Sequence, residues 1–340
     1  MKTIARITGV AAAFALAAAP LAAQSYHVAH TYTLGGEGGW DYLALDTVGN
    51  RLFITRGDRA IVVDPASGKA LGEVPGIVGA HGVAFSYASG LGFATSGRDS
   101  SVVVFDLKSL KVVKRTPAAP DADAILFDPA TKRVFTFNGD SHNSTVIDAA
   151  TGDRVGTVDL GAGPEFGVSA GDGHVYVNLE TTSEVAEIDA RAMKVTRKWS
   201  IAPCESPSGL AIDQAHHLLF SVCRSGTMAM SDVVKGAVVA TAPIGRGVDA
   251  ARFDPATGFA FASNGEGTLT VVHEDSPTAL HVVETDTTWP GARTMELDPR
   301  DHWIYTVSAK FGPMPAAAPG ERRRRPPMVP GTFTLLVLER

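Results

Sequence analysis

Cysteine is scarce in this chain, and several sequence motifs that mark well-known chemistries are missing. Cys204 and Cys223 are the only cysteines among the 340 residues, and no Cys-x-x-Cys-His haem-attachment motif occurs. A phosphate-binding loop is missing as well. After residue 19, no apolar stretch reaches the length of a transmembrane helix. The sequence therefore gives no indication of c-type haem, of a nucleotide held by such a loop, or of a membrane-spanning chain.

Basic residues are also fewer than acidic residues. Thirty Lys and Arg residues face 36 Asp and Glu residues, which gives a formal net charge of −6. An acidic balance argues against nucleic acid as a partner and mainly favours solubility. Hydrophobic residues, at 45%, are sufficient for a packed core, while 35 glycines and 20 prolines supply the many turns that an all-β chain needs.

The N-terminus has the pattern of a Sec-type secretory signal peptide. Lys2 and Arg6 precede an uncharged apolar run at residues 7–19, Pro20 ends the run, and Leu21-Ala22-Ala23 offers small residues for cleavage. We predict a signal peptide at 1–23 and a periplasmic or extracellular mature chain from residue 24, with a net charge of −6 − 2 = −8 once Lys2 and Arg6 are removed. The alternative is an uncleaved membrane anchor, although about 13 apolar residues are too few to span a bilayer.

An internal repeat of about 42 residues is the main signal in the sequence. One turn recurs with starting positions 42, 42, 41, 43 and 42 residues apart, at Asp64, Asp106, Asp148, Asp189, Asp232 and Glu274. A second turn lies out of phase with the first, at Asp46, Asp128, Asp213, Asp254 and Asp298. Between the turns lie short runs rich in Val, Ile, Phe and Thr, four to a repeat, which is typical of the blades of a β-propeller.

The repeats predict an all-β fold, a seven-bladed β-propeller that forms one domain over residues 24–340. Seven inner strands begin near Tyr42, Val83, Ala124, Gly167, Gly209, Ala251 and Met295. The last repeat has only three strands of its own, and the run at residues 26–34 can supply the fourth. An N-terminal strand that pairs with the C-terminal blade closes the ring and removes its exposed edges.

The two cysteines fit this frame. Cys204 lies just before the inner strand of the fifth blade, and Cys223 ends the antiparallel strand beside it. We predict a disulfide between them, as expected in an oxidising compartment. The alternative is a pair of free, buried thiols.

Several short segments carry a resemblance to a known family. They are Gly39-Trp40-Asp41-Tyr42, Phe105-Asp106-Leu107, Pro120-Asp121-Ala122-Asp123, Phe137-Asn138-Gly139, Val146-Ile147-Asp148-Ala149-Ala150-Thr151-Gly152 and Ser263-Asn264-Gly265. Over the whole mature chain, the repeats resemble the YVTN-type, YncE-like β-propeller proteins. The resemblance implies a propeller fold and export, whereas function varies widely among such propellers. No literal Tyr-Val-Thr-Asn occurs, and Tyr176-Val177-Asn178 is the nearest approach.

Polar residues recur in the loops that surround one end of the predicted channel. The loops that lead into the inner strands carry Asp41, His81, Asp123, Glu165, Glu205, Asp249 and Arg293. The loops between the second and third strands carry Arg98, Asp99, Asn138, Asp140, His142, Asn178, Glu180, Arg224, Asn264, Glu266 and Lys310. Of the two sets we predict as ligand-binding Asp41, His81, Arg98, Asp123, Asn138, His142, Glu165, Asn178, Glu205, Asp249, Asn264 and Arg293.

The residue types at this mouth allow two kinds of chemistry. Carboxylates with one imidazole can hold a divalent cation, so His81, Asp123, Glu165 and Asp249 are candidate metal ligands. Crowded carboxylates also raise one another's pKa, which makes His81, Glu165 and Asp249 candidates for proton transfer. The alternative is that these residues have no binding role and recur because the entrance to the channel is exposed to solvent in every propeller.

We therefore predict an exported, monomeric binding or scaffold module that holds a small polar ligand or a protein partner at the channel mouth. The alternative function is a metal-assisted lyase or hydrolase that acts on a small polar or sugar-like substrate at the same mouth. Residues 312–331 form a Pro-rich insertion in the last blade with the basic run Arg322-Arg323-Arg324-Arg325. The insertion is either a solvated loop or a basic lid that attracts an anionic ligand.

Three other patterns are set aside at this level. Gly167-Val168-Ser169-Ala170-Gly171 matches a nucleophile elbow, but that motif needs a strand-to-helix turn that an all-β repeat does not provide. His216-His217 begins a strand and is interpreted as structural. His273-Glu274 ends a third strand and does not have the His-x-x-x-His spacing of a zinc helix.

Overall fold

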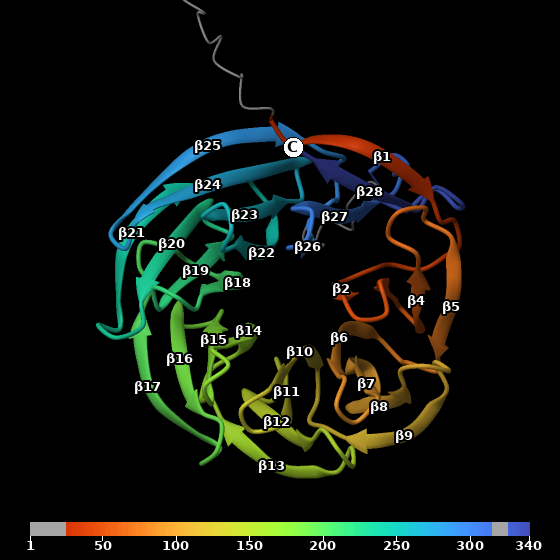
Figure 1. The fold of residues 1–340 in the computed structure, drawn as a ribbon, viewed down its shortest axis with the longest axis horizontal. Helices are drawn as coiled ribbons and strands as arrows, with labels where there is room; N and C mark the ends of the chain where they lie inside the picture. The colour runs from red at the N-terminus through yellow and green to blue at the C-terminus, as the bar shows by residue number, and fades with distance from the viewer. Residues whose placement is uncertain (1–24, 315–325) are drawn as a thin grey trace, which may run out of the picture.

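The chain folds into a ring of seven four-stranded antiparallel sheets around a central channel (Figure 1). The computed structural model describes residues 25–314 and 326–340. The predicted signal peptide at 1–23 and the run of four arginines at 322–325 lie outside the described residues. The seven-bladed propeller predicted from the repeats is therefore confirmed.

Each blade runs from an inner strand at the channel to an outer strand at the rim. The innermost strands are β2 (Leu43–Asp46), β6 (Ala80–Ser86), β10 (Ala122–Asp128), β14 (Pro164–Ser169), β18 (Pro207–Asp213), β22 (Val248–Asp254) and β26 (Met295–Asp298). The second strands are β3 (Arg51–Arg56), β7 (Leu91–Ser96), β11 (Arg133–Asn138), β15 (His174–Leu179), β19 (Leu218–Cys223), β23 (Phe259–Asn264) and β27 (Trp303–Ser308).

The outer half of each blade has the same regular order. The third strands are β4 (Arg59–Val63), β8 (Ser101–Asp106), β12 (Asn143–Asp148), β16 (Glu184–Asp189), β20 (Thr227–Asp232), β24 (Thr268–Ser276) and β28 (Thr334–Glu339). The outermost strands are β5 (Ala70–Pro75), β9 (Val112–Pro117), β13 (Arg154–Asp159), β17 (Lys194–Ser200), β21 (Ala237–Pro243), β25 (Ala279–Thr287) and β1 (His27–Thr33). A single 3₁₀ turn (Gly97–Asp99) is the helical element in the described part of the chain, and no described helix is long and apolar enough to cross a membrane.

Aromatic residues fill the space between the blades at one repeated position. The third residue of every second strand is a buried Phe or Tyr: Phe53, Phe93, Phe135, Tyr176, Phe220, Phe261 and Tyr305. Burial of each ring contributes roughly 1.5–3 kcal/mol to the stability of the folded state. Because side chains alternate along a strand, the aromatic ring of each blade faces the sheet of the next blade. The sequence repeat therefore specifies the packing between blades as well as the turns.

The ring is closed by strands from the two ends of the chain. β1 pairs antiparallel with β28, from His27 opposite Glu339 to Thr33 opposite Thr334, and the seventh sheet has the order β1-β28-β27-β26. Tyr26, which is 1% exposed, packs edge-on against Phe261 at a centroid distance of 5.3 Å and donates its hydroxyl to the His302 carbonyl at 3.1 Å. The predicted closure is confirmed, and Tyr26 also joins blade six to blade seven.

The predicted disulfide is present. Cys204 and Cys223 are bonded, their Cα atoms lie 5.5 Å apart, and both residues are fully buried. The bond ties the segment before β18 to the end of β19, where Pro207 is the cross-strand partner of Cys223. A buried structural disulfide is typical of proteins outside the reducing cytosol.

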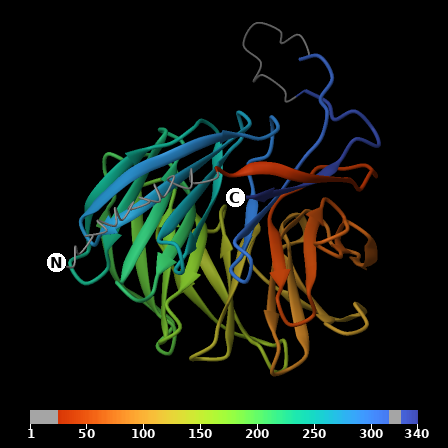
Figure 2. The same ribbon diagram turned by 45° about the horizontal axis from the view of Figure 1, so that its top comes forward.

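The insertion in the seventh blade begins on a short two-stranded stem. Phe311 and Met328 form an antiparallel bridge, Gly312 N–H donates to the Pro327 carbonyl at 2.8 Å, and Val329 N–H donates to the Lys310 carbonyl at 2.8 Å. The stem extends away from the body of the ring (Figure 2). The Phe311 ring lies 6.0 Å from that of Trp40, so the base of the stem contacts the segment that leads into the first inner strand.

Candidate binding site at the mouth of the channel

Hydroxyl groups on the blades hold the main chain of the mouth residues in place. Thr55 Oγ1 donates to the His81 carbonyl at 2.9 Å, and Thr95 Oγ1 donates to the Asp123 carbonyl at 2.6 Å. Thr294 Oγ1 donates to the Asp41 carbonyl at 2.8 Å. Each bond runs from one blade to the next. Partly buried hydrogen bonds between neighbouring blades therefore position the main chain of the mouth.

His81 lies between two carboxylates from neighbouring blades. Its Nδ1 is 2.7 Å from Asp41 Oδ2 and 3.2 Å from Asp123 Oδ1. Burial lowers the pKa of His81, but the hydrogen bond to Asp41 and the charge of Asp123 outweigh it and raise that pKa to about 9. Burial raises the pKa of Asp123 to about 7 against the opposing charge of His81. One ligand atom from each of the three residues lies within 4.8 Å of the others, a spacing that suits a single divalent cation.

Arg293 connects this group to blade six. Its Nε donates to Asp249 Oδ2 at 2.7 Å, and its Nη2 lies 3.3 Å from Asp41 Oδ1. The Asp249 side chain is only 15% exposed, and burial raises its pKa even though Arg293 opposes the shift. The guanidinium therefore compensates charge on two carboxylates at once.

Glu165, Glu180 and Arg224 form the other half of the mouth. Arg224 Nη1 donates to Glu180, and Arg224 Nη2 lies 3.5 Å from Glu165 Oε1. Burial, the charge of Asp123 and a hydrogen bond with Glu180 raise the pKa of Glu165 to about 10. Its surroundings therefore favour the neutral, protonated form of the Glu165 carboxyl.

An aromatic layer lies among these charges and was missed at the sequence level. Tyr42 is 5% exposed, and its ring packs on Phe166 at a centroid distance of 4.9 Å. Burial and the charges of Asp249 and Asp123 raise the pKa of Tyr42 well above its usual value, so its phenol stays protonated. Beside Phe166, Arg252 stacks on the ring and forms an ion pair with Glu296 at 2.7 Å. These residues lie on or beside inner strands, whereas the predicted site residues were taken from the loops.

The structure separates the predicted ligand-binding residues into three groups. Asp41, His81, Asp123, Glu165, Asp249 and Arg293 come together in the ion pairs described above. Arg98, His142 and Glu205 are exposed; Arg98 lines a separate cavity of about 550 Å³, and Glu205 lines one of about 660 Å³. Asn138, Asn178 and Asn264 are fully buried, and their amides bond within or between blades, so we leave them out of the proposed site.

Replacement of Glu165 by Gln is expected to flatten the pH dependence of stability. The pKa of Glu165 is about 10 in the folded state against a reference value of 4.5, so the folded protein binds one proton more than the unfolded chain between those values. Its contribution is complete below pH 4.5 and is lost as the pH rises towards 10, by at most about 1.4 kcal/mol per pH unit. Urea unfolding from about pH 5 to about pH 9 measures the slope.

The matched control for this prediction is Glu205→Gln, which changes an exposed carboxylate on the same face. We expect the control profile to run parallel to that of the wild type and the Glu165→Gln profile to be shallower. Parallel profiles for all three proteins would show that Glu165 ionises normally in the folded state.

Comparisons with known proteins support the fold. No family model matches this chain, and no curated protein resembles it in sequence closely enough to count as a relative. Among solved structures, hydrazine synthase of Kuenenia stuttgartiensis aligns with a TM-score of 0.70 at 16% identity, over 79% of this chain and 92% of that one. The WD40 repeats of RRP9 align with a TM-score of 0.76 at 12% identity, over 93% and 99%, and U3-55K aligns with 0.75 at 11%, over 92% and 99%. At these sequence identities, the structural similarity shows that the chain has the fold of a seven-bladed β-propeller. It does not show a family or a function.

Proposed function

We propose that this chain is an exported binding module that holds a small, polar ligand at the mouth of its channel. The observation that carries the proposal is the convergence of charged side chains from all seven blades on one opening: Asp41, His81, Asp123, Glu165, Arg224, Asp249 and Arg293. A propeller commonly serves as a binding or scaffold module. The N-terminal signal pattern and the buried disulfide support export.

The charges at the mouth favour a ligand that donates hydrogen bonds. Both guanidiniums already pair with carboxylates, whereas each carboxylate retains lone pairs that are free to accept. Asp123 Oδ1 is buried, and its nearest described partner is His81 Nδ1 at 3.2 Å. Amines and sugar-like polyols supply further donors to the carboxylates, and the half-buried Phe166 offers a ring for their apolar edges.

A second candidate is a metal-assisted lyase or hydrolase at the same mouth. It is favoured by the Asp41, His81 and Asp123 group, which could take a divalent ion, and by Glu165, whose raised pKa suits a proton donor. In this reading the metal would polarise the substrate, and Arg293 would bind its negative charge.

The thermal unfolding midpoint in the presence of defined probes tests the proposal. Glucosamine, glucose and putrescine represent the donor-rich ligands, while Ca²⁺ and Mn²⁺ represent the metal. We expect at least one donor-rich probe to raise the midpoint of the wild type and of Glu205→Gln by about 2 °C or more at saturation. Asp249→Asn should lose that shift.

The outcomes separate the two candidates. A shift with Mn²⁺ that disappears in His81→Ala favours the metal-assisted enzyme. No shift with any probe, or shifts that survive Asp249→Asn, would overturn the proposal that the mouth binds ligand.

A further inference from the structure

The outer hairpin of blade six departs from the repeat at one position. In four other blades, the residue opposite the first residue of the second strand is an aspartate: Asp106, Asp148, Asp189 and Asp232. The Oδ1 atom of each accepts backbone N–H groups of the following turn, for example from Ala150 and Thr151 onto Asp148 at 2.9 Å. In blade six this place is taken by His273, opposite Phe259.

The loss of that aspartate coincides with a longer hairpin. β24 and β25 have nine residues each, whereas the other third strands have five or six, and pairing continues through Glu274 opposite Leu280 to Ser276 opposite Ala279. His273 and Asp275 are two residues apart on β24, and Asp275 lies at a β-bulge between Glu274 and Ser276. His281 is the direct cross-strand partner of His273. The longer hairpin therefore carries all three polar side chains.

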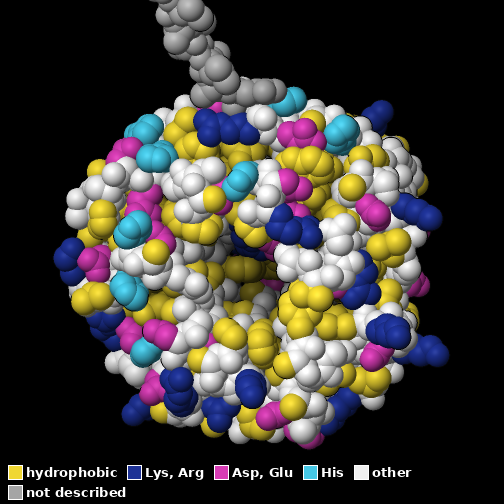
Figure 3. All heavy atoms as spheres, viewed as in Figure 1, with side chains coloured by type: hydrophobic (Ala, Val, Ile, Leu, Met, Phe, Trp, Pro, Cys, Tyr) yellow, Lys and Arg dark blue, Asp and Glu magenta, His cyan; other side chains and the backbone are white. Residues whose placement is uncertain are grey.

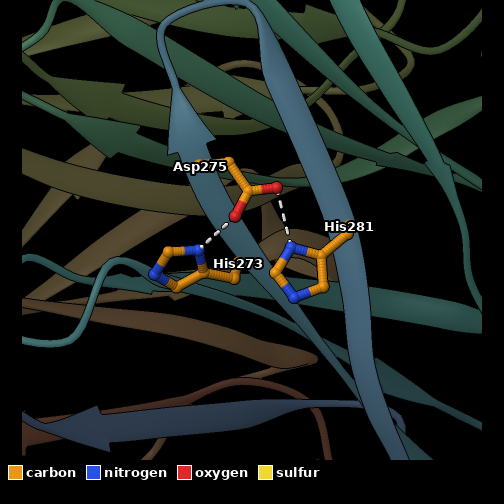
Figure 4. A group of neighbouring side chains, drawn as sticks. All are labelled: His273, Asp275 and His281. Carbon is orange, nitrogen blue, oxygen red and sulfur yellow. Dashed lines mark hydrogen bonds and ion pairs between the residues drawn. The ribbon is translucent and has the colours of Figure 1, made fainter.

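These side chains converge on one carboxylate (Figure 4). His273 Nδ1 lies 2.8 Å from Asp275 Oδ1, and His281 Nδ1 lies 2.7 Å from Asp275 Oδ2. The side chains are 34%, 39% and 54% exposed for His273, Asp275 and His281, so the group is open to solvent. The His273 ring packs edge-on against Phe259 at 5.6 Å, which fixes one ligand in place.

We propose that His273, Asp275 and His281 form a binding site for a divalent transition-metal ion of the zinc type. One ligand atom from each side chain lies within 4.8 Å of the others, and two imidazoles with one carboxylate are a donor set that suits such ions. In the absence of metal, the Nδ1–H group of each imidazole donates to the carboxylate. Metal binding moves that proton to the distal nitrogen through solvent, so both Nδ1 lone pairs face the ion. Water or a group from a partner completes the coordination.

Other histidines also lie on the surface of the ring. The space-filling view of this face shows histidine side chains gathered along one side of the ring, around the hollow centre (Figure 3). On the opposite face of β24, Glu274 joins Asp213 and His216 in a second group, with His216 Nδ1 3.1 Å from Glu274 Oε1. That group has two nearly buried carboxylates and one imidazole, so it offers fewer nitrogen ligands for a soft ion.

Titration of the untagged protein, residues 24–340, with Zn²⁺ by calorimetry tests the proposal, and Co²⁺ absorption reports the ligand set. We expect one site whose affinity falls at least tenfold in His281→Ala and in Asp275→Asn. His281 is exposed, so circular dichroism should show an unchanged fold. His217→Ala, at an exposed histidine of blade five, is the control and should bind as the wild type does.

Two further variants distinguish this site from the others. Zn²⁺ affinity should be unchanged in His81→Ala, which removes the imidazole at the mouth, and in His216→Ala. The proposal is overturned if the wild type binds no Zn²⁺ or if His281→Ala and Asp275→Asn bind as tightly as the wild type. The experiment measures Zn²⁺ affinity at the outer hairpin of blade six. If this proposal fails, the proposed ligand site at the mouth is unaffected. If the ligand site at the mouth fails, the proposed metal site is unaffected.

Discussion

A chain that begins at Leu34, and so has no β1, is expected to lose its cooperative fold and to aggregate. The deletion leaves β28 as an exposed edge, and Leu335, Leu336, Val337 and Leu338 on that strand are almost fully buried in the closed ring. An apolar edge with unpaired N–H and C=O groups is a template for intermolecular pairing. The whole domain is stabilised by only about 5–15 kcal/mol, so the loss of a strand pair exceeds what the fold tolerates.

Size-exclusion chromatography and urea unfolding check this result. A milder variant, Tyr26→Ala, removes the buried side chain that packs on Phe261 and donates to the His302 carbonyl. It should cost about 3–5 kcal/mol while β1 stays paired with β28. Replacement of the exposed His30 by Ala is the control on the same strand and should cost much less. A monomeric, cooperatively unfolding truncated chain would show that the other six blades are stable without closure.

Replacement of Arg56 by Ala is expected to destabilise the protein by about 3–5 kcal/mol. Arg56 is 1% exposed, and its guanidinium donates to the carbonyls of Gly35, Glu37 and Gly38 at 3.2, 2.7 and 3.0 Å. The same group stacks 3.7 Å from the centroid of the Phe333 ring. Burial lowers the pKa of Arg56 to about 10, which still leaves it charged at neutral pH. Its removal leaves three carbonyls without a donor and opens a cavity beside Phe333.

Arg56→Lys should give an intermediate loss, because one ammonium does not reproduce the planar stack and the forked donors together. The exposed Arg98 provides the control, since Arg98→Ala changes charge on the same face with little packing. Urea midpoints with unchanged slopes measure both effects. A loss of less than about 1 kcal/mol in Arg56→Ala would show that water replaces the guanidinium at those carbonyls.

The fold could be read from the sequence because its signals are local and repeated. The turn that begins at Asp106 or Asp148 is capped by the aspartate's own side chain, and the strands between the turns alternate apolar residues. Closure by β1 followed from counting strands, since the last repeat supplied only three. The Cys204–Cys223 bond followed from the position of each cysteine relative to two adjacent strands.

The candidate site could be read only in part. Asp41, His81, Asp123, Glu165, Asp249 and Arg293 recur at nearly the repeat spacing, so their common placement at the mouth was predictable. The sequence did not predict which charged side chains form ion pairs. Arg293 pairs with Asp249 and Arg224 pairs with Glu165, and each pair joins two different blades. Asn138, Asn178 and Asn264 have the same spacing, yet their side chains turn into the blades.

The sequence by itself determined the number of blades, the strand order, the closure of the ring and the disulfide, because each depends on periodicity along the chain. Only the tertiary structure decided where buried charge is compensated, as at Arg56 and at Arg293 between its two carboxylates. It also decided that the longer hairpin of blade six brings His273, Asp275 and His281 together. Such groups form through contacts across strands and blades, whose geometry is set by the packing of the whole ring.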